Sequence, residues 1–255
     1  FCLCCGGSRL PSSRTSRSIL LRLLLVASST VFPALQNLPT TTAFPISMMR
    51  AVVYSRLDVE GIKVVSKARP AAVNATKKGN NILCRVVCAG INPVDAKGLV
   101  GDKLPHACSP LARRAIDGKT VGFDFAGTVM EVPAGCEYKP GDAVYGTMPP
   151  GAGSFCEYVS APLDQVAKKP SSLSFSEAAS LPLVGLTSVQ ALVHDNGLVS
   201  GQHLLLIGAS GGVGHVALQV AKAVGASVTA VCSQRNAEFV QRLGADRVVD
   251  YTKGD

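Results

Sequence analysis

The chain has 255 residues, of which 47% are hydrophobic and 16% are charged. This length and apolarity support one large or two modest folded domains and exclude a disordered chain. Aromatic residues make up only 5%, with no tryptophan, so the composition does not suggest a surface that stacks bases or sugars.

The net charge of +8 is unevenly distributed along the chain. Residues 1–57 contain no Asp or Glu. Four of the 25 basic residues precede Met48, and the remaining 21 nearly balance the 17 acids. A nucleic-acid-binding protein needs Lys and Arg clustered on its folded body, so we expect no nucleic-acid partner. The four early basic residues are Arg9, Arg14, Arg17 and Arg22.

The N-terminal segment has the composition of a targeting peptide. The chain begins at Phe1 rather than Met, so we expect the natural N-terminus to lie upstream. The apolar run 19–27 is too short to span a membrane and is interrupted by Arg22, but it fits a signal-peptide core. We therefore expect no stable membrane insertion, and residues 1–47 are expected to lie outside the folded body.

The destination of this segment is open between two organelles. The Ser-, Thr- and Pro-containing stretch that follows has no acids, and Ala43-Phe44-Pro45 resembles the cleavage site of bipartite plastid signals. This favours a plastid over a mitochondrion, although an Arg-rich, acid-free presequence also suits the latter. A third interpretation is an untranslated stretch wrongly joined to the gene, in which case the protein is cytoplasmic.

Nine cysteines occur, but none forms a CxxC pair within the body of the chain. Paired CxxC motifs are typical of tetrahedral zinc sites. We therefore expect the body cysteines to be small buried hydrophobic residues in a reducing compartment.

Short predicted strands dominate residues 48–173. Strands of this kind with Gly and Pro turns between them indicate an all-β domain, a compact antiparallel barrel. Pro93 cannot donate to a ladder, so the strand before it should end there and a turn begin. The predicted strands cover 49–57, 62–70, 81–90, 120–132, 139–146, 154–162 and 166–170.

The pattern changes at residue 174, where Ser174 and Glu177 have the spacing of a capping box that begins a helix. Strands then alternate with helices, which predicts a parallel α/β sheet, a Rossmann domain, over 174–255. The chain stops after the third parallel strand, so we expect an incomplete, C-terminally truncated sheet of the six-stranded kind. Residues 204–207 are continuously apolar and are predicted to be buried on both faces.

A glycine loop follows the first parallel strand. It reads Ala209-x-Gly211-x-x-Gly214, with Gly208 just before the alanine that replaces the usual first glycine. Gly211 lets the main chain approach a pyrophosphate, Gly214 lets the helix pack close to the strand, and the helix start offers N–H groups to the phosphates. The apolar face of this helix is predicted at Val213, Val216, Ala217, Val220, Ala221 and Val224.

The end of the second parallel strand distinguishes the two nicotinamide cofactors. An NAD-binding site places an acid there, to bond the ribose 2′-hydroxyl. No acid occurs between Asn196 and Ala237. Ser233 and Arg235 occupy this region and could instead hold a 2′-phosphate, the arginine through a charge-assisted fork. The pattern favours NADPH.

Taken in order, these motifs resemble the medium-chain dehydrogenase/reductase superfamily, in its zinc-free quinone oxidoreductase and enoyl reductase branch. The matching segments are AGINPVDAK, VGFDFAGTVMEV, KPGDAVYG, LPLVGLTSVQAL, GASGGVG, CSQRN and LGADRVVDY. The resemblance implies a GroES-like barrel followed by a Rossmann domain, with the substrate cleft between them. Zinc-dependent members use an early Cys and a His-Glu pair, but this chain has Asn92 to Asp95 and Gly122 to Asp124 there, so we expect no metal.

The resemblance also implies roles for individual residues. Asn92 is implied near the nicotinamide and Thr187 in the same pocket. Each has a structural alternative, because Asn92 before Pro93 can simply make a turn and Thr187 can pack within a helix. Gly211, Gly212 and Val213 are implied to cradle the pyrophosphate, and Ser233, Arg235 and Tyr251 to surround the 2′-phosphate, with a strand-end aromatic as the alternative for Tyr251.

We therefore expect hydride transfer from NADPH to a quinone or an α,β-unsaturated carbonyl without a metal. A trans-2-enoyl thioester reductase is less favoured, because no Tyr follows the Asn-Pro motif as a proton donor. Asp95 and Lys97, which do follow it, are interpreted as solvated turn charges. A non-catalytic, nucleotide-binding or partner-binding fragment is the alternative from another class. A homodimer is expected for a full-length chain.

Overall fold

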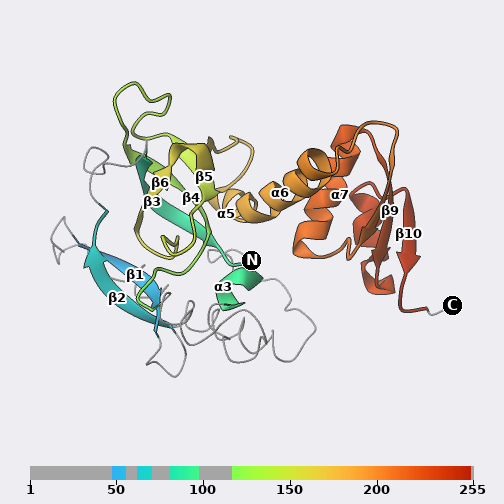
Figure 1. Cartoon of the computed structure of the whole chain (residues 1–255), viewed down its shortest axis with the longest axis horizontal. Helices are drawn as coiled ribbons and strands as arrows, with labels where there is room; N and C mark the ends of the chain where they lie inside the picture. The colour runs from blue at the N-terminus through green and yellow to red at the C-terminus, as the bar shows by residue number, and fades with distance from the viewer. Residues whose placement is uncertain (1–47, 56–61, 71–80, 98–116, 254–255) are drawn as a thin grey trace. The chain divides into compact units, whose positions relative to one another are not determined.

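The computed structural model describes residues 48–55, 62–70, 81–97 and 117–253 (Figure 1). The predicted targeting segment 1–47 lies outside the described residues. The chain divides into two compact units, Phe1–Pro182 and Leu183–Asp255. No helix within the described ranges is long and apolar enough to cross a membrane.

The first unit contains seven strands, two α-helices and one short 3-10 helix among its described residues. Helix α6 begins at its boundary and continues into the second unit, which holds a parallel sheet with its helices. The elements in chain order are β1 (Met48–Tyr54), β2 (Ile62–Ala68), β3 (Asn81–Gly90), α3 (Pro93–Lys97), β4 (Asp124–Glu131), β5 (Ala143–Thr147), β6 (Tyr158–Pro162), η3 (Leu163–Gln165), β7 (Val166–Lys168), α5 (Phe175–Ala179), α6 (Pro182–Val189), η4 (Gln190–Asp195), β8 (His203–Ile207), α7 (Gly212–Val224), β9 (Ser227–Cys232), η5 (Gln234–Asn236), α8 (Ala237–Arg242) and β10 (Arg247–Asp250).

An antiparallel sheet of five strands, in the order β6-β3-β4-β5-β7, forms the body of the first unit. Strand β1 makes single bridges to the segments that precede β6 and β4, between Ala51 and Cys156 and between Val53 and Thr120. This confirms the predicted all-β domain. The core is an apolar cluster of inward-facing side chains that includes Ile82, Cys84, Phe125, Val129, Tyr138, Val144, Met148, Val159, Ala161 and Val166.

One charged pair fastens β1 to the segment that leads into β6. The Nε and Nη2 atoms of Arg50 donate to Glu157 Oε1 at 3.1 and 2.6 Å, and the backbone N–H of Arg50 donates to Oε2 at 2.9 Å. Because the pair is partly buried and makes three hydrogen bonds, it holds the strands in one register more firmly than a solvated ion pair does.

Helix α5 begins with the predicted capping box. The Ser174 hydroxyl accepts from the Glu177 N–H at 3.2 Å, and the Glu177 carboxylate accepts from the Ser174 N–H at 2.8 Å. The helix packs against β3, β4 and β5 of the first unit and buries Ala178 and Ala179. It comes so close to β3 that a Cβ at Gly90 would lie 2.4 Å from the Ala179 carbonyl oxygen.

The second unit contains the predicted parallel sheet, in the order β10-β9-β8. Helices α7 and α8 cover one face, where Leu218, Ala221 and Val240 pack against Val228 and other strand residues. The described sheet has no cover on its other face. The prediction that residues 204–207 are buried on both faces is therefore wrong, because Leu205 is 59% and Ile207 77% exposed.

The buried stripe of α7 lies about one residue away from the predicted one. Its buried residues are Gly214, Ala217, Leu218 and Ala221, whereas the predicted Val213 is 41% exposed. Only the two alanines are common to both sets. The shift arises because Gly214 itself packs onto the turn after β8, which rotates its own side of the helix toward the sheet.

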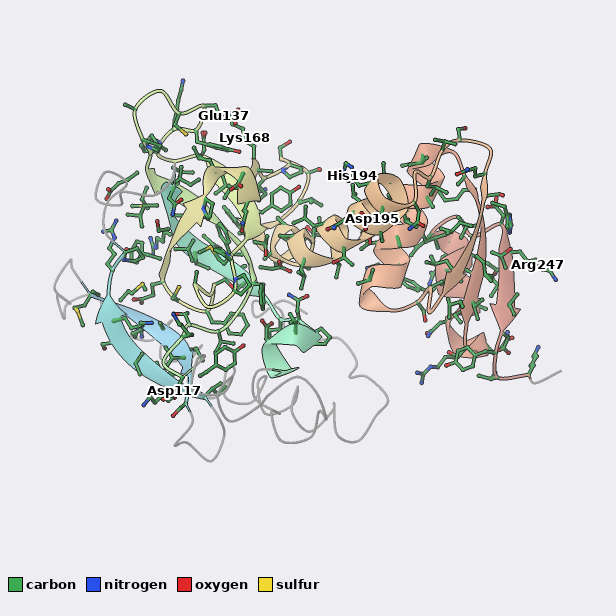
Figure 2. All side chains as sticks on the ribbon, viewed as in Figure 1. Asp117, Glu137, Lys168, His194, Asp195 and Arg247 are labelled. Atoms are coloured by element: carbon green, nitrogen blue, oxygen red, sulfur yellow. The ribbon has the colours of Figure 1, made fainter. Side chains whose placement is uncertain are left out.

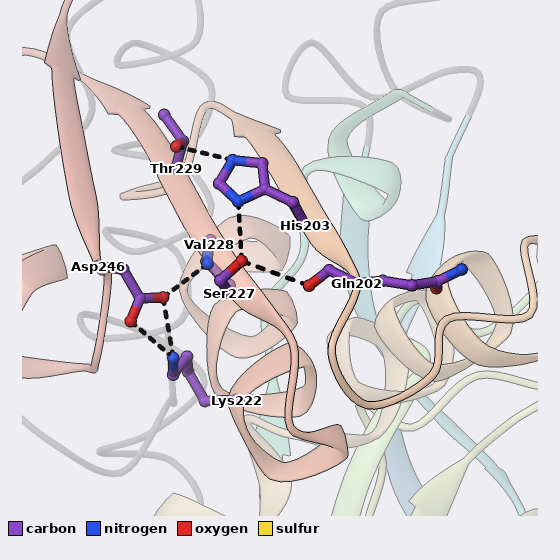
Figure 3. Close-up of polar contacts among 7 residues, drawn as sticks. All are labelled: Gln202, His203, Lys222, Ser227, Val228, Thr229 and Asp246. Carbon is purple, nitrogen blue, oxygen red and sulfur yellow. Dashed lines mark hydrogen bonds and ion pairs between the residues drawn. The ribbon is translucent and has the colours of Figure 1, made fainter.

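Polar contacts tie the three parallel strands together at their amino ends, as Figure 3 shows. Asp246 Oδ2, just before β10, accepts from the Val228 N–H of β9 at 2.6 Å and from Lys222 Nζ of α7 at 2.8 Å. The hydrogen bonds from Lys222 and Val228 lower the pKa of this carboxyl. The ring of His203 lies between the hydroxyls of Ser227 and Thr229, at 2.8 and 3.0 Å. Arg247 of β10 is exposed (Figure 2).

The cysteines differ from expectation at one position. Cys84, Cys136, Cys156 and Cys232 are free thiols. Burial raises the pKa of the Cys84 and Cys156 thiols to about 12, so both stay protonated and unreactive near neutral pH. Cys88, however, is disulfide-bonded, so the expectation of reduced thiols is wrong there.

Gly214→Ala tests the contact between α7 and the strand turn. A Cβ at Gly214 would lie 2.2 Å from the Gly208 carbonyl oxygen and 2.9 Å from Ala209 Cα. Both are backbone groups that cannot move aside, so we expect a loss of about 3 kcal/mol in the free energy of unfolding, measured by urea denaturation.

The matched control is Gly185→Ala in α6, where no heavy atom lies within 4 Å of the added carbon. This change should be neutral or stabilise the chain by about 0.5–1 kcal/mol. Equal effects of the two substitutions would contradict the proposed close packing.

Candidate cofactor and substrate site

Asn92 lies where β3 ends and α3 begins. Pro93 is the first residue of α3, a position that needs no N–H donor, so the turn expected after β3 is a short helix. Asn92 is 7% exposed. Its Nδ2 donates to Asp124 Oδ2 at 3.0 Å, and its backbone N–H donates to Asp95 Oδ2 at 2.7 Å. Two carboxylates from different elements therefore fix one asparagine.

The interpretation of Asp95 as a solvated turn charge is wrong. Its side chain is fully buried, and its Oδ1 has no hydrogen-bond partner within the described residues. The Tyr54 hydroxyl donates to its carbonyl oxygen at 3.0 Å. The carboxylate caps the N-terminus of α3 rather than facing water, because it closes back on the Asn92 N–H three residues earlier. The side chain of Lys97 lies outside the described residues.

Burial sets the protonation of this cluster. Desolvation raises the pKa of Asp95 to about 7, with a smaller contribution from the neighbouring Asp124 carboxylate. Burial, together with the Asp95 charge, also raises the pKa of the Tyr54 phenol. Asp95 is thus held near the point where a proton is gained or lost at neutral pH.

The glycine loop forms the start of the second unit's first βα turn. Gly208, just before the alanine that replaces the usual first glycine, takes the left-handed conformation, with a φ of +72°. Ala209 is fully buried beneath the loop. Gly211 is the N-cap residue of α7, and with no side chain it leaves the helix uncapped.

The first turn of α7 presents unpaired donors. Gly211, Gly212 and Val213 are exposed, and α7 has no acid in its first turn. The backbone N–H groups of Gly212, Val213 and Gly214 have no hydrogen-bond partner in the described part of the chain. A thirteen-residue helix with three free N–H groups at its positive end can bind a diphosphate.

The regions after β9 and β10 hold the next predicted residues, and of these Ser233 is connected to the glycine loop through Asn236. Ser233 lies just before η5, and the exposed Arg235 lies within it. Tyr251, which is 67% exposed, follows β10. Asn236 Nδ2 donates to Ser210 Oγ of the glycine loop at 3.0 Å and to Ser233 Oγ at 3.3 Å. The carboxyl ends of β8 and β9 are therefore joined through one amide.

Thr187 lies in α6, in the second unit, and its hydroxyl donates to the Leu183 carbonyl at 2.7 Å. The side chain is exposed. Asn92 belongs to the first unit, so the prediction that both residues line one pocket stays a prediction. The neighbouring Ser188 is buried and donates to Val184 at 2.7 Å and to Val213 at 3.3 Å, which connects α6 with the glycine loop.

Comparison with protein families identifies both halves of the chain. Residues 78–171 match the family described as Alcohol dehydrogenase GroES-like domain, and residues 212–255 match the family described as Zinc-binding dehydrogenase. The chain belongs to the medium-chain dehydrogenase/reductase superfamily. The name of the second family refers to zinc, but within the described ranges no three His, Cys, Asp or Glu residues are grouped to hold a metal.

Individual relatives indicate the branch. The chain is 41% identical over 187 residues to the mouse (Mus musculus) NAD(P)H oxidoreductase RTN4IP1, mitochondrial, covering 69% of this chain and 47% of that protein. It is 36% identical over 241 residues to the Arabidopsis thaliana NADPH-dependent alkenal/one oxidoreductase, chloroplastic, covering 91% and 59%. The structure of the quinone oxidoreductase from Coxiella burnetii matches with a TM-score of 0.68 and 31% identity, covering 82% and 64%.

These matches confirm the predicted branch, the zinc-free quinone oxidoreductase-like one. They also confirm the predicted fold of a GroES-like domain and an incomplete Rossmann sheet. The chain spans about half to three-fifths of the length of these curated relatives.

Three residues of the site were missed or misjudged from the sequence. Asn236 and Ser210 were not singled out, and Asp95 was assigned to solvent. Asp95 lies three residues after Asn92, the spacing at which an acidic side chain accepts from the N-cap backbone N–H of a helix. This spacing could have indicated that Asp95 caps a helix instead of facing solvent. Nothing in the sequence pattern joins Asn236 to Ser210, because their contact depends on the pairing of β8 with β9.

The raised pKa of Asp95 predicts a dependence of stability on pH. The folded chain retains a proton that the unfolded carboxyl loses, so the stabilisation is complete below the unfolded pKa, about 4, and is lost as pH rises to 7. Relative to Asp95→Asn, the wild-type chain should lose up to about 4 kcal/mol in the free energy of unfolding between pH 4 and pH 8. Chemical denaturation across this range measures the difference.

Glu177→Gln provides a control of opposite sign. The hydrogen bonds from Ser174 lower the pKa of Glu177, so the wild-type chain should gain stability over this variant as pH rises through the ionisation of the carboxyl. A difference between wild type and Asp95→Asn that does not change with pH would refute the proton on Asp95.

Proposed function

We propose that this protein transfers hydride from NADPH to a quinone or an α,β-unsaturated carbonyl without a metal. The observation that carries the proposal is the uncapped start of α7, where the exposed residues Gly212 and Val213 have unpaired backbone N–H groups after a tightly packed glycine turn. The names of the relatives support the substrate classes, since one is a quinone oxidoreductase and another an alkenal/one oxidoreductase.

The glycine loop fits a dinucleotide. Any Cβ at Gly214 would strike the backbone of the preceding turn, and a larger residue at Gly211 would lie 3.2 Å from Gly208 O and stand over the helix start. The main chain can therefore approach a pyrophosphate closely. Gly211, Gly212, Val213 and Gly214 would hold the two phosphates, with Ala209 supporting the loop from below.

Ser233, Arg235 and Tyr251 would surround the 2′-phosphate of the adenosine ribose. The Arg235 guanidinium is exposed and makes no ion pair or hydrogen bond with the described residues, so it is available to an anion. An arginine fork matches phosphate geometry, whereas a carboxylate in this position would repel it. This supports NADPH over NADH.

In the first unit, Asn92 would lie at the reacting end. One hydrogen of its amide NH₂ group is committed to Asp124, so its carboxamide oxygen and the second N–H hydrogen are left to orient a partner. The bound nicotinamide supplies the hydride. A quinone can take its proton from solvent, and the buried acid Asp95 would act on the reaction by fixing Asn92.

The names of the relatives also bear on the cellular location, although they do not distinguish one organelle from another. The relatives include a mitochondrial and a chloroplastic protein, which supports an organellar protein. We propose a plastid, from the composition of residues 1–47.

Turnover is tested with NADPH oxidation at 340 nm, using 1,2-naphthoquinone and a 2-alkenal as acceptors. We expect saturable, metal-independent oxidation of NADPH that is unchanged by a chelator, because the described residues offer no metal site. Both the 255-residue chain and a form extended to the length of its relatives should be assayed. A folded, extended protein that binds NADPH but reduces neither acceptor would leave only a nucleotide-binding role.

Arg235→Ala tests the choice of cofactor. Removal of a charge-assisted pair with the 2′-phosphate should raise the KM for NADPH about 10- to 100-fold and leave the KM for NADH nearly unchanged. Arg247→Ala, another exposed arginine of the second unit, is the matched control and should change neither value. Equal changes for the two cofactors with Arg235→Ala would refute the assignment.

A further inference from the structure

Asn236 joins the glycine loop, which we assign to the pyrophosphate, to the loop after β9, which we assign to the 2′-phosphate. Its Nδ2 lies 3.0 Å from Ser210 Oγ, in the loop after β8, and 3.3 Å from Ser233 Oγ, in the loop after β9. Its backbone N–H donates to the Ser233 carbonyl at 2.9 Å, which fixes the turn of η5. The side chain is half-buried, so this contact is held within the fold rather than formed in open solvent.

The direction of these two hydrogen bonds determines what the serines can do. An amide NH₂ group has two hydrogens and no lone pair to offer, so both serine oxygens must accept. Neither hydroxyl makes another hydrogen bond within the described residues. Each serine therefore keeps its own O–H hydrogen available as a donor.

The charges around these donors suit an anion. Arg235, immediately before Asn236, is exposed and unpaired within the described residues. The acid at the end of the neighbouring strand, Asp250, pairs in register with Cys232. Its Oδ1 accepts from the Thr252 N–H at 3.0 Å and from the Thr252 hydroxyl at 2.7 Å, and its Oδ2 is buried.

We propose that Asn236 is a positioning residue that sets cofactor specificity, by holding the Ser210 and Ser233 hydroxyls as donors toward the 2′-phosphate of NADPH. The inference rests on the proposed binding of NADPH in this unit. An acceptor at position 236 would reverse the arrangement, because the serines would then donate inward and a negative charge would face the phosphate.

The test is the selectivity for a 2′-phosphate, measured without any hydride transfer. Isothermal titration calorimetry gives the Kd of the whole chain for 2′,5′-ADP and for ADP, which differ only in that phosphate. Asn236→Asp should lower the ratio of Kd(ADP) to Kd(2′,5′-ADP) by about tenfold or more. Asn236→Leu, which removes the donor without adding charge, should lower the ratio by a smaller factor. Asn196→Asp is the control, since the Asn196 side chain donates to the Ala191 carbonyl and the substitution should leave the ratio unchanged.

A double-mutant cycle identifies the route of the effect. If Asn236 acts through the hydroxyls, Ser233→Ala should lower the ratio in the wild-type chain but change it little in Asn236→Leu. The ratio compares two ligands on one protein, so a general loss of stability cancels. If Asn236→Asp does not fold, the Asn236→Leu arm carries the test.

The outcomes separate the two proposals. A wild-type chain that binds ADP and 2′,5′-ADP equally well overturns both the preference for NADPH and the role of Asn236. A wild-type preference for 2′,5′-ADP that persists in Asn236→Asp and Asn236→Leu overturns the role of Asn236 alone and leaves the preference for NADPH standing.

Discussion

The close approach of α7 to the end of β8 is the constraint on which the second unit depends. Gly214 packs directly on the Gly208–Ala209 turn, and any side chain there would overlap backbone atoms. This contact fixes which side of α7 faces the sheet, and so which residues enter the core. It also fixes the direction of the helix start, and so where the free N–H groups of Gly212 and Val213 point. Packing and binding thus share one cause.

The first unit depends on a different constraint, which is the burial of two carboxylates beside one asparagine. Asp95 and Asp124 are both fully buried, and each accepts from a different group of Asn92. Two adjacent charges in a dry environment repel each other, so the arrangement is more stable when Asp95 holds a proton. The asparagine is thereby held by its backbone and its side chain together, and its amide cannot turn without breaking a buried hydrogen bond. A neutral turn residue would not need this support.

The sequence predicted the elements well because local rules govern them. The bounds of β3, the capping box of α5 and the strand–helix alternation of the second unit all depend on neighbours in the chain. The sequence was less informative wherever a contact joined distant segments. It predicted burial on both faces for Leu205 and Ile207, since an apolar run does not reveal how many layers cover a sheet. It assigned Asp95 to solvent for the same reason, because burial there depends on packing against Tyr54, 41 residues away. The contact of Asn236 with Ser210 spans 26 residues and has no local signal.

The starts of α5 and α7 differ in whether side chains of the protein bind the free N–H groups of the first turn. At α5, Ser174 and Glu177 occupy the free N–H groups themselves, and the helix end is complete. At α7, Gly211 contributes no side chain, and the first-turn donors stay open. A serine or aspartate cap at Gly211 would stabilise the helix by roughly a few tenths of a kcal/mol. Helix α5 is therefore stabilised by side-chain capping, and helix α7 lacks this stabilisation. A helix of thirteen residues that is packed along one face can tolerate this loss, and the uncapped end gains the capacity to bind an anion. The same logic extends to Asn236, where one amide occupies the acceptor side of two serines and leaves their donor side open.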